Sequence, residues 1–168
     1  LDYCFTNGVN DDGTYDDTNE INTVKMTVES LKKWIMNNPN CENYMIGQAD
    51  TPGGCPCDKC RHAAEKYKGG GRMVRFINLV NRQIQEWAKE ACPERHIKFT
   101  MFAYLYTLDA PINDEGNVID NTCIPDPEVY VKYAPIKTAT YYSFDDPRQP
   151  THDAYENLAL WSKITDRF

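Results

Sequence analysis

Long apolar runs, basic clusters and an opening leader are all missing from this chain. Its longest apolar run, residues 99–105, is far shorter than the roughly 20 residues that a membrane-spanning helix needs. The formal net charge is −7, and the Lys and Arg residues are scattered rather than gathered into the basic footprint that binds a phosphate backbone. We therefore expect neither a membrane span nor a nucleic-acid partner.

An initiator methionine is also missing, because the chain begins with Leu1. Its 168 residues, 41% of them hydrophobic, suffice for one core, since domains usually hold roughly 100–150 residues. We expect residues 1–168 to form a single domain that is a fragment of a larger barrel domain. Residue 1 is then a boundary that conceals any signal peptide or preceding domain.

Three stretches of the sequence have helical periodicity. Apolar residues recur at helical spacing over residues 21–35, and Pro39 ends that pattern. A longer stripe covers residues 73–91. A third stretch covers residues 151–164, with Thr151 as its N-cap.

Short apolar or β-branched runs alternate with these helices. They cover residues 44–47, 97–106 and 129–133, and residues 3–6 form a further candidate strand. The alternation predicts parallel β/α units, and the second run is apolar at consecutive positions, as in a strand covered on both faces. The fold class is therefore α/β, with about four strands and three helices, roughly half of a TIM-like (β/α)8 barrel. A small doubly wound sheet is the alternative.

Half a barrel leaves an open sheet edge. We expect the remainder of a larger chain, or a second copy in a homo-oligomer, to cover that edge. The chemistry of either arrangement should lie at the carboxyl ends of the strands.

The most specific motif is a group of three cysteines, Cys55, Cys57 and Cys60. Thiolates at this spacing can bind one soft ion such as tetrahedral zinc, which needs a fourth ligand. Cys4 is the first candidate, because it should emerge at the same edge of the sheet as the loop that carries the motif. A redox role is disfavoured, because the motif does not open a helix directly after a strand.

Disulfide bonds are the alternative use of the cysteines. Cys41 and Cys92 each lie just before a predicted strand, hence at the opposite edge of the sheet, and form a natural pair. The chain has 7 cysteines, so they cannot all be paired internally. Cys123 and His62 stand behind Cys4 as candidates for the fourth zinc ligand. Zinc and disulfides can also coexist.

Asp50 is the candidate for direct chemistry. It follows the run at residues 44–47, so it lies at the carboxyl end of a predicted strand, where β/α folds place their active sites. Glycoside cleavage usually needs two carboxylates at a defined separation. The candidates for the second carboxylate are Asp109, Asp145 and Asp146.

The same strand-end rule selects further side chains that could bind a substrate. They are Asn7, Gln48, Tyr104 and Tyr106. Tyrosine suits sugar surfaces because it combines a flat apolar face with a polar tip.

A run of glycines precedes the second predicted helix. Gly69, Gly70 and Gly71 fit no nucleotide-binding fingerprint, and we interpret them as a flexible linker. Arg72 and Arg75 follow in the first helical turn, within reach of a carboxylate-bearing ligand.

Several segments together resemble one protein family. They are IGQAD at residues 46–50, C-x-C-x-x-C at 55–60, RFIN at 75–78, FAYLYT at 102–107, VYVKYAPI at 129–136 and LWSKI at 160–164. With these segments in this order, the chain resembles the central portion of the DUF4838 family of glycosidase-like β/α-barrel proteins. The resemblance covers nearly the whole chain.

This resemblance implies a carbohydrate-active protein that is secreted, periplasmic or at the cell surface of a polysaccharide-degrading bacterium. It also implies a fold similar to that of α-glucuronidases and β-hexosaminidases, with Asp50, Tyr104 and Tyr106 lining a sugar site.

Two functions follow as expectations. The first is a glycoside hydrolase-like domain in which Asp50 is a general acid or positions the ligand, while the strand-end tyrosines contact the sugar. The alternative is a non-catalytic carbohydrate-binding or structural module stapled by zinc or disulfides. A second carboxylate close to Asp50 would favour the enzyme.

Overall fold

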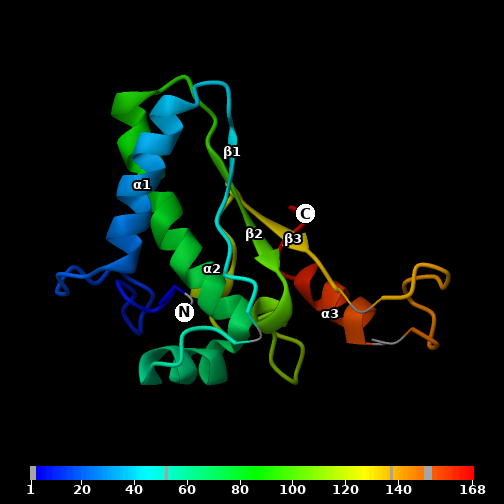
Figure 1. Cartoon of the computed structure of the whole chain (residues 1–168). Helices are drawn as coiled ribbons and strands as arrows, with labels where there is room; N and C mark the ends of the chain where they lie inside the picture. The colour runs from blue at the N-terminus through cyan, green and yellow to red at the C-terminus, as the bar shows by residue number, and fades with distance from the viewer. Residues whose placement is uncertain (1–2, 52, 137, 150–152) are drawn as a thin grey trace.

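The computed structural model describes residues 3–51, 53–136, 138–149 and 153–168, and Figure 1 shows how its elements are arranged. In chain order they are α1 (Thr23–Asn37), β1 (Asn43–Met45), α2 (Asp58–Ala91), β2 (Lys98–Ala103), the short helices η1 (Leu105–Thr107) and η2 (Asn121–Cys123), β3 (Val129–Tyr133) and α3 (Asp153–Trp161). The mixture of parallel strands and helices confirms the predicted α/β class.

The sheet has the strand order β1-β2-β3, and both strand pairs are parallel. Parallel neighbours need a crossover connection, which α2 supplies between β1 and β2. β3 coincides with the run predicted at residues 129–133. β2 is buried at three consecutive positions, Phe99, Thr100 and Met101, which confirms the expectation of a strand covered on both faces.

The strand predicted at residues 3–6 does not form. The chain turns there instead, and the Asn7 N–H donates to the carbonyl of Cys4 at 3.1 Å, while the Val9 N–H donates to that of Thr6 at 3.3 Å. These local bonds use backbone groups that a neighbouring strand would need. The expectation of a strand there was wrong, and the sheet of the described residues has three strands rather than four.

Helix α1 lies close to its predicted position. The side chain of Asn22 caps it by accepting a hydrogen bond from the Lys25 N–H at 3.0 Å. Its apolar face packs against α2. The buried residues of this face are Val24, Val28, Leu31 and Ile35.

Helix α2 is longer than the sequence predicts, because it starts at Asp58 rather than near Met73. A kink interrupts it at Lys68, whose φ of 58° and ψ of 171° are not helical. The segment before the kink is polar and exposed on most sides, so it lacks the apolar stripe by which the second part was recognised.

The three glycines after the kink are part of α2, so their interpretation as a flexible linker was wrong. Close packing is the reason for glycine here. A Cβ at Gly69 would lie 1.6 Å from the carbonyl oxygen of Tyr106, and one at Gly70 would lie 2.3 Å from that of Asp109. Gly71 is similarly confined, so the run lets the helix approach the backbone that follows β2.

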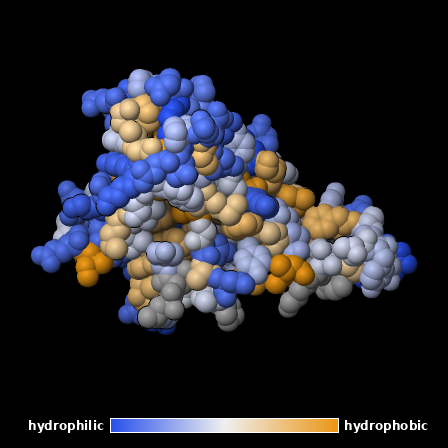
Figure 2. Space-filling view, turned by 45° about the horizontal axis from the view of Figure 1, so that its top comes forward, coloured by the Kyte–Doolittle hydropathy of each residue, from blue (hydrophilic) through white to orange (hydrophobic). Residues whose placement is uncertain are grey.

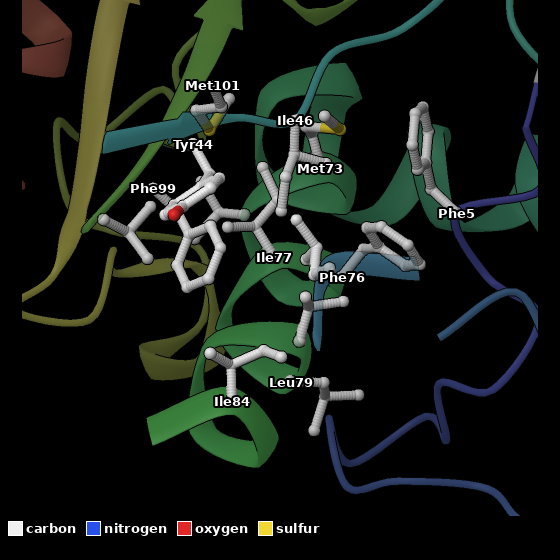
Figure 3. Packing of buried hydrophobic residues seen from close by; sticks show 14 of the residues in the cluster. Phe5, Tyr44, Ile46, Met73, Phe76, Ile77, Leu79, Ile84, Phe99 and Met101 are labelled. Atoms are coloured by element: carbon white, nitrogen blue, oxygen red, sulfur yellow. The ribbon is translucent and has the colours of Figure 1, made fainter. Parts of the chain in front are cut away.

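One hydrophobic core joins the sheet to α2 and α1. Figure 3 shows Phe76 and Ile77 of α2 pointing into it, with Tyr44 and Phe99 of the sheet close by. Phe5 lies edge-on to Phe76, with ring centroids 5.1 Å apart. This contact anchors the N-terminal segment on α2.

The C-terminal part of the chain completes the described fold. Trp161 of α3 donates a hydrogen bond from Nε1 to the carbonyl of Leu108 at 2.7 Å, which ties α3 to the loop after η1. The carbonyl of Arg167 accepts from the Val131 N–H at 2.9 Å and so covers the outer edge of β3. The N-cap predicted at Thr151 lies outside the described residues.

The opposite edge of the sheet is open, since β1 pairs only with β2 within the described part of the chain. Beside it lies a largely apolar groove of about 570 Å³ lined by Ile21, Met26, Trp34 and Met45 among others. Figure 2 shows apolar patches scattered over a mostly hydrophilic surface. Among the described residues, no helix is both long enough and apolar enough to cross a membrane.

Candidate functional site

Four cysteines from three parts of the chain meet beside the start of α2. Cys4 comes from the N-terminal segment, Cys55 and Cys57 from the loop before the helix, and Cys60 from its first turn. Their sulfur atoms all lie within 4.8 Å of one another. The Cys4 sulfur is 3.8 Å from that of Cys57 and 3.6 Å from that of Cys60. The structure thus brings together the four cysteines that the sequence grouped.

The start of α2 fixes the geometry of this cluster. Cys57 is the N-cap, and its sulfur accepts a hydrogen bond from the Cys60 N–H at 3.4 Å. The motif therefore opens a helix, although a loop separates it from β1. A helix N-terminus favours negative charge, which helps to stabilise thiolates there.

The thiols of the cluster have unequal acidity. Hydrogen bonds from Cys60 and then Thr6 lower the pKa of Cys4 to about 4, against the opposing effect of partial burial. The bond to Cys4, followed by burial, raises the pKa of Cys60, and burial raises that of Cys55. Thr6 contributes directly, with its hydroxyl 3.1 Å from the Cys60 sulfur. Deprotonation of Cys4 is thus favoured, whereas deprotonation of its neighbours is disfavoured. A bound cation would stabilise several thiolates at once.

The remaining thiols lie elsewhere. Cys41 donates from its sulfur to the carbonyl of Asn43 at 3.3 Å, and Cys92 is buried; both are free thiols. Burial raises the pKa of Cys123 to about 12. Neither Cys123 nor His62 belongs to the four-sulfur cluster of the described residues.

Asp50 lies on the exposed edge beyond β1 and contacts the end of β2. The Tyr104 hydroxyl donates to Asp50 Oδ1 at 2.9 Å. The Gln48 side chain donates from Nε2 to the Tyr104 carbonyl and to the Thr107 hydroxyl, each at 2.8 Å. Two neighbouring strand ends are therefore connected by side chains.

The Tyr104 phenol of this pair is a hydrogen-bond donor to a carboxylate. The hydrogen bond to the Asp50 carboxylate raises the pKa of Tyr104. Thr107, which is fully buried, also donates to the carbonyl of Phe102 at 2.9 Å, so the turn into η1 is held from within. Tyr104 as donor and Asp50 as acceptor are thus already hydrogen-bonded to each other at the surface.

The other predicted ligand-binding residues have different surroundings. The Tyr106 ring lies 5.5 Å from the guanidinium carbon of Arg72 and borders Gly54, in the loop that leads to the cysteine cluster. Asn7 donates to the carbonyl of Ile21 at 2.7 Å and so holds the approach to α1.

The three candidates for a second carboxylate each bind a residue of their own region. Asp109 Oδ1 accepts from Asn157 at 3.2 Å, and Asp145 Oδ1 accepts from the hydroxyl of Ser143 at 2.7 Å. Asp146 pairs with Arg148 at 2.7 Å. Each of these contacts organises the loop in which it lies.

Arg72 and Arg75, which the sequence singled out for an anionic ligand, line a cavity beside the cysteine cluster, but sequence reasoning missed the cavity's other basic residues. Its basic side chains include Lys59, His62 and Lys66 from the first part of α2. Their spacing places them on one face of a helix, and this would have been the signal once the helix was known to begin at Asp58.

Comparison with known proteins assigns the chain to a family. A family model described as Domain of unknown function (DUF4838) matches residues 17–168 of the chain. No curated protein and no solved structure matches it. The matched region includes Cys55, Cys57, Cys60 and Asp50, whereas Cys4 precedes it. The chain belongs to the DUF4838 family.

Proposed function

We propose that the four-cysteine cluster holds a structural zinc ion. The observation that carries this proposal is the meeting of four sulfur atoms within 4.8 Å of one another. A tetrahedral site with Zn–S bonds of about 2.3 Å has sulfurs about 3.8 Å apart. The measured distances of 3.8 Å and 3.6 Å from Cys4 to two other sulfurs are close to this value.

The donor set also fits zinc chemically. Four thiolates are soft ligands that favour zinc over calcium or magnesium, and a complete set of four leaves no open position for a substrate. Such an ion would staple the N-terminal segment and the loop after β1 to the start of α2. Its role is structural.

The sugar site of this proposal is the edge where β1 and β2 end. Asp50 and Tyr104 present a carboxylate and a phenol from adjacent strands, and Tyr106 adds an aromatic face beside the stapled loop. Carboxylates and aromatic rings are suited to the hydroxyls and the apolar faces of sugars. We propose carbohydrate binding here, with Asp50 positioning the ligand.

Catalysis is the less supported role. Glycoside hydrolysis uses two carboxylates roughly 5–10 Å apart, and the candidates for the second one are engaged in their own loops. The family resemblance supports a location outside the cytoplasm, either secreted, periplasmic or at the cell surface. We further propose that the remainder of a longer chain, or a second copy, covers the open edge of β1.

The carbohydrate proposal predicts a specific loss of binding in Asp50→Asn. Losing the charged partner of a sugar hydroxyl weakens binding by about 1.5–3 kcal/mol, roughly tenfold to a hundredfold. Titration calorimetry with oligosaccharides first identified on a glycan array measures the change. The fold should be unaffected, because Asp50 is exposed.

Asp114→Asn is the matched control, since it removes the same charge from an exposed loop elsewhere. Its affinity should equal that of the wild type. Equal affinities of the wild type and Asp50→Asn, or a wild type that binds no glycan on the array, would contradict a sugar site at this edge.

A further inference from the structure

A cavity of about 430 Å³ lies between the N-terminal segment and the first part of α2. This volume is within the range of small-molecule sites, roughly 300–1,000 Å³. The cavity adjoins the proposed sugar edge through the contact of Arg72 with Tyr106, but neither Asp50 nor Tyr104 lines it. Apolar surface from Phe5, Val9 and Ala63 forms part of its wall.

Positive charge dominates the polar part of the lining. Four Lys and Arg side chains and one histidine face a single acidic residue, Asp11. The basic residues are Lys59, His62, Lys66, Arg72 and Arg75. Such an excess is notable in a chain whose formal net charge is −7. The cavity is therefore a local positive region on an acidic protein.

Two of the cations are buried, and they differ in how well they are satisfied. Arg75 is 4% exposed and donates to the carbonyls of Asn10 and Asp11, both at 2.9 Å, and it also lies 3.8 Å from the Asp120 carboxylate. Arg75 thus has a structural role in joining the N-terminal loop to η2.

Arg72 is 5% exposed and donates from Nη1 to the carbonyl of Cys60 at 3.0 Å. Its Nε has no hydrogen-bond partner, and no carboxylate pairs with it, within the described part of the chain. A buried guanidinium without an anionic partner is costly, because burial removes its hydration. The Tyr106 ring, 5.5 Å from the guanidinium carbon, offers Arg72 a cation–π contact but no full negative charge. The missing anionic partner of Arg72 is therefore what a ligand anion would supply.

The two lysines at the rim are held only weakly by the protein. Lys59 lies 4.0 Å from a carboxylate oxygen of Asp16, and Lys66 lies 4.9 Å from the centre of the Tyr67 ring. Both are exposed. They are free to turn toward an anion that enters.

We propose that this cavity binds a small organic ligand through an oxyanion, either a carboxylate or a sulfate or phosphate group. Arg72 supplies the buried cation, Lys59 and Lys66 supply the outer ones, and the apolar wall receives the carbon skeleton of the ligand. This site is additional to the proposed sugar edge and does not depend on it.

Calorimetric titration of the full chain tests the proposal, with inorganic sulfate, inorganic phosphate and glucuronate as probes and glucose as the neutral control. We expect at least one anion to bind, no binding of glucose to the cavity, and an affinity that falls as sodium chloride is raised. A preference for glucuronate identifies a carboxylate ligand, and a preference for sulfate or phosphate identifies a tetrahedral one.

The double variant Lys59→Gln/Lys66→Gln should weaken anion binding about tenfold or more. Its matched control is Lys25→Gln/Lys33→Gln, which removes the same charge from exposed positions of α1 and should bind as the wild type does. Arg72→Lys should weaken binding as well, and the lysine pair provides the test if that buried variant does not fold.

Two results would overturn the proposal. One is the finding that none of the three anions binds the wild type with a dissociation constant below about 10 mM, which corresponds to a binding free energy of roughly 3 kcal/mol. The other is equal weakening in the α1 control, which would show a general effect of net charge. Anion binding that persists in Asp50→Asn separates this site from the sugar edge, whatever the fate of the sugar proposal.

Discussion

Cys60→Ser is expected to release the bound zinc and to lower the midpoint of thermal unfolding by about 10 °C. Cys60 is fully buried, and its sulfur contacts both Cys4 and Thr6. Because a structural metal binds the folded state, its binding free energy adds to the stability of the fold. A loss of roughly 3–5 kcal/mol corresponds to about 2–4 °C for each kcal/mol in a chain of this size.

Metal analysis together with differential scanning calorimetry measures both effects. The wild type should contain one zinc per chain, and a strong chelator should lower its midpoint as the variant does. Cys41→Ser is the control, since Cys41 lies outside the four-sulfur cluster and should keep the metal. A metal-free wild type with intact disulfides among Cys55, Cys57 and Cys60 would disprove the zinc proposal.

Gly69→Ala is expected to destabilise the fold by about 3 kcal/mol or more, as overpacking against a rigid backbone does at its most severe. The new Cβ would lie 1.6 Å from the carbonyl oxygen of Tyr106, and backbone cannot rotate away as a flexible side chain can. Either α2 or the turn after β2 must shift. That turn carries Tyr104 and Tyr106, so the Asp50 edge should change with it.

Gly53→Ala is the matched control for this substitution. Gly53 has no neighbouring heavy atom within 4 Å of an added Cβ, so the same change in sequence should alter stability by less than about 0.5 kcal/mol. Urea unfolding followed by tryptophan fluorescence gives both free energies. If the two variants were equally stable, the close approach of α2 to Tyr106 would be incorrect.

The parts of the fold that the sequence predicts well are those with a local signal. The strand at residues 129–133 is a short run of β-branched and aromatic residues between prolines, and it forms as predicted. The apolar stripe of α1 is equally clear. By contrast, residues 3–6 have strand-like composition, yet they turn back on themselves and lack a partner strand. Strand pairing depends on residues far apart in the chain, and local composition alone does not predict it.

The run of three glycines in α2 shows the same limit of prediction from local sequence. A run of three glycines suggests flexibility when only composition is known, because glycine is conformationally permissive. In the structure the run is packed helix, and the reason lies some 37 residues further along the chain, at the backbone of Tyr106. No local pattern reports such a contact.

The site was predicted in part. Grouping Cys4 with the later cysteines relied on its expected place at the end of a strand, and the grouping is present although that strand is not. The link between Asp50 and Tyr104 follows from the rule that parallel strands end at one edge. The basic cavity could not be foreseen in full, because it depends on where the N-terminal segment folds against α2.

If the cluster holds zinc as proposed, the spacing of the four cysteines also implies an order of assembly. Cys55, Cys57 and Cys60 are neighbours in the sequence, so they can capture an ion while the rest of the chain is still unfolded, whereas Cys4 is 53 residues away from Cys57. The entropy of closing that loop would make Cys4 the last of the proposed ligands to join. Rapid-mixing refolding with and without zinc would resolve this step. Because Phe5 follows Cys4 directly, completing the metal site and seating the N-terminal segment on α2 become one concluding event of folding.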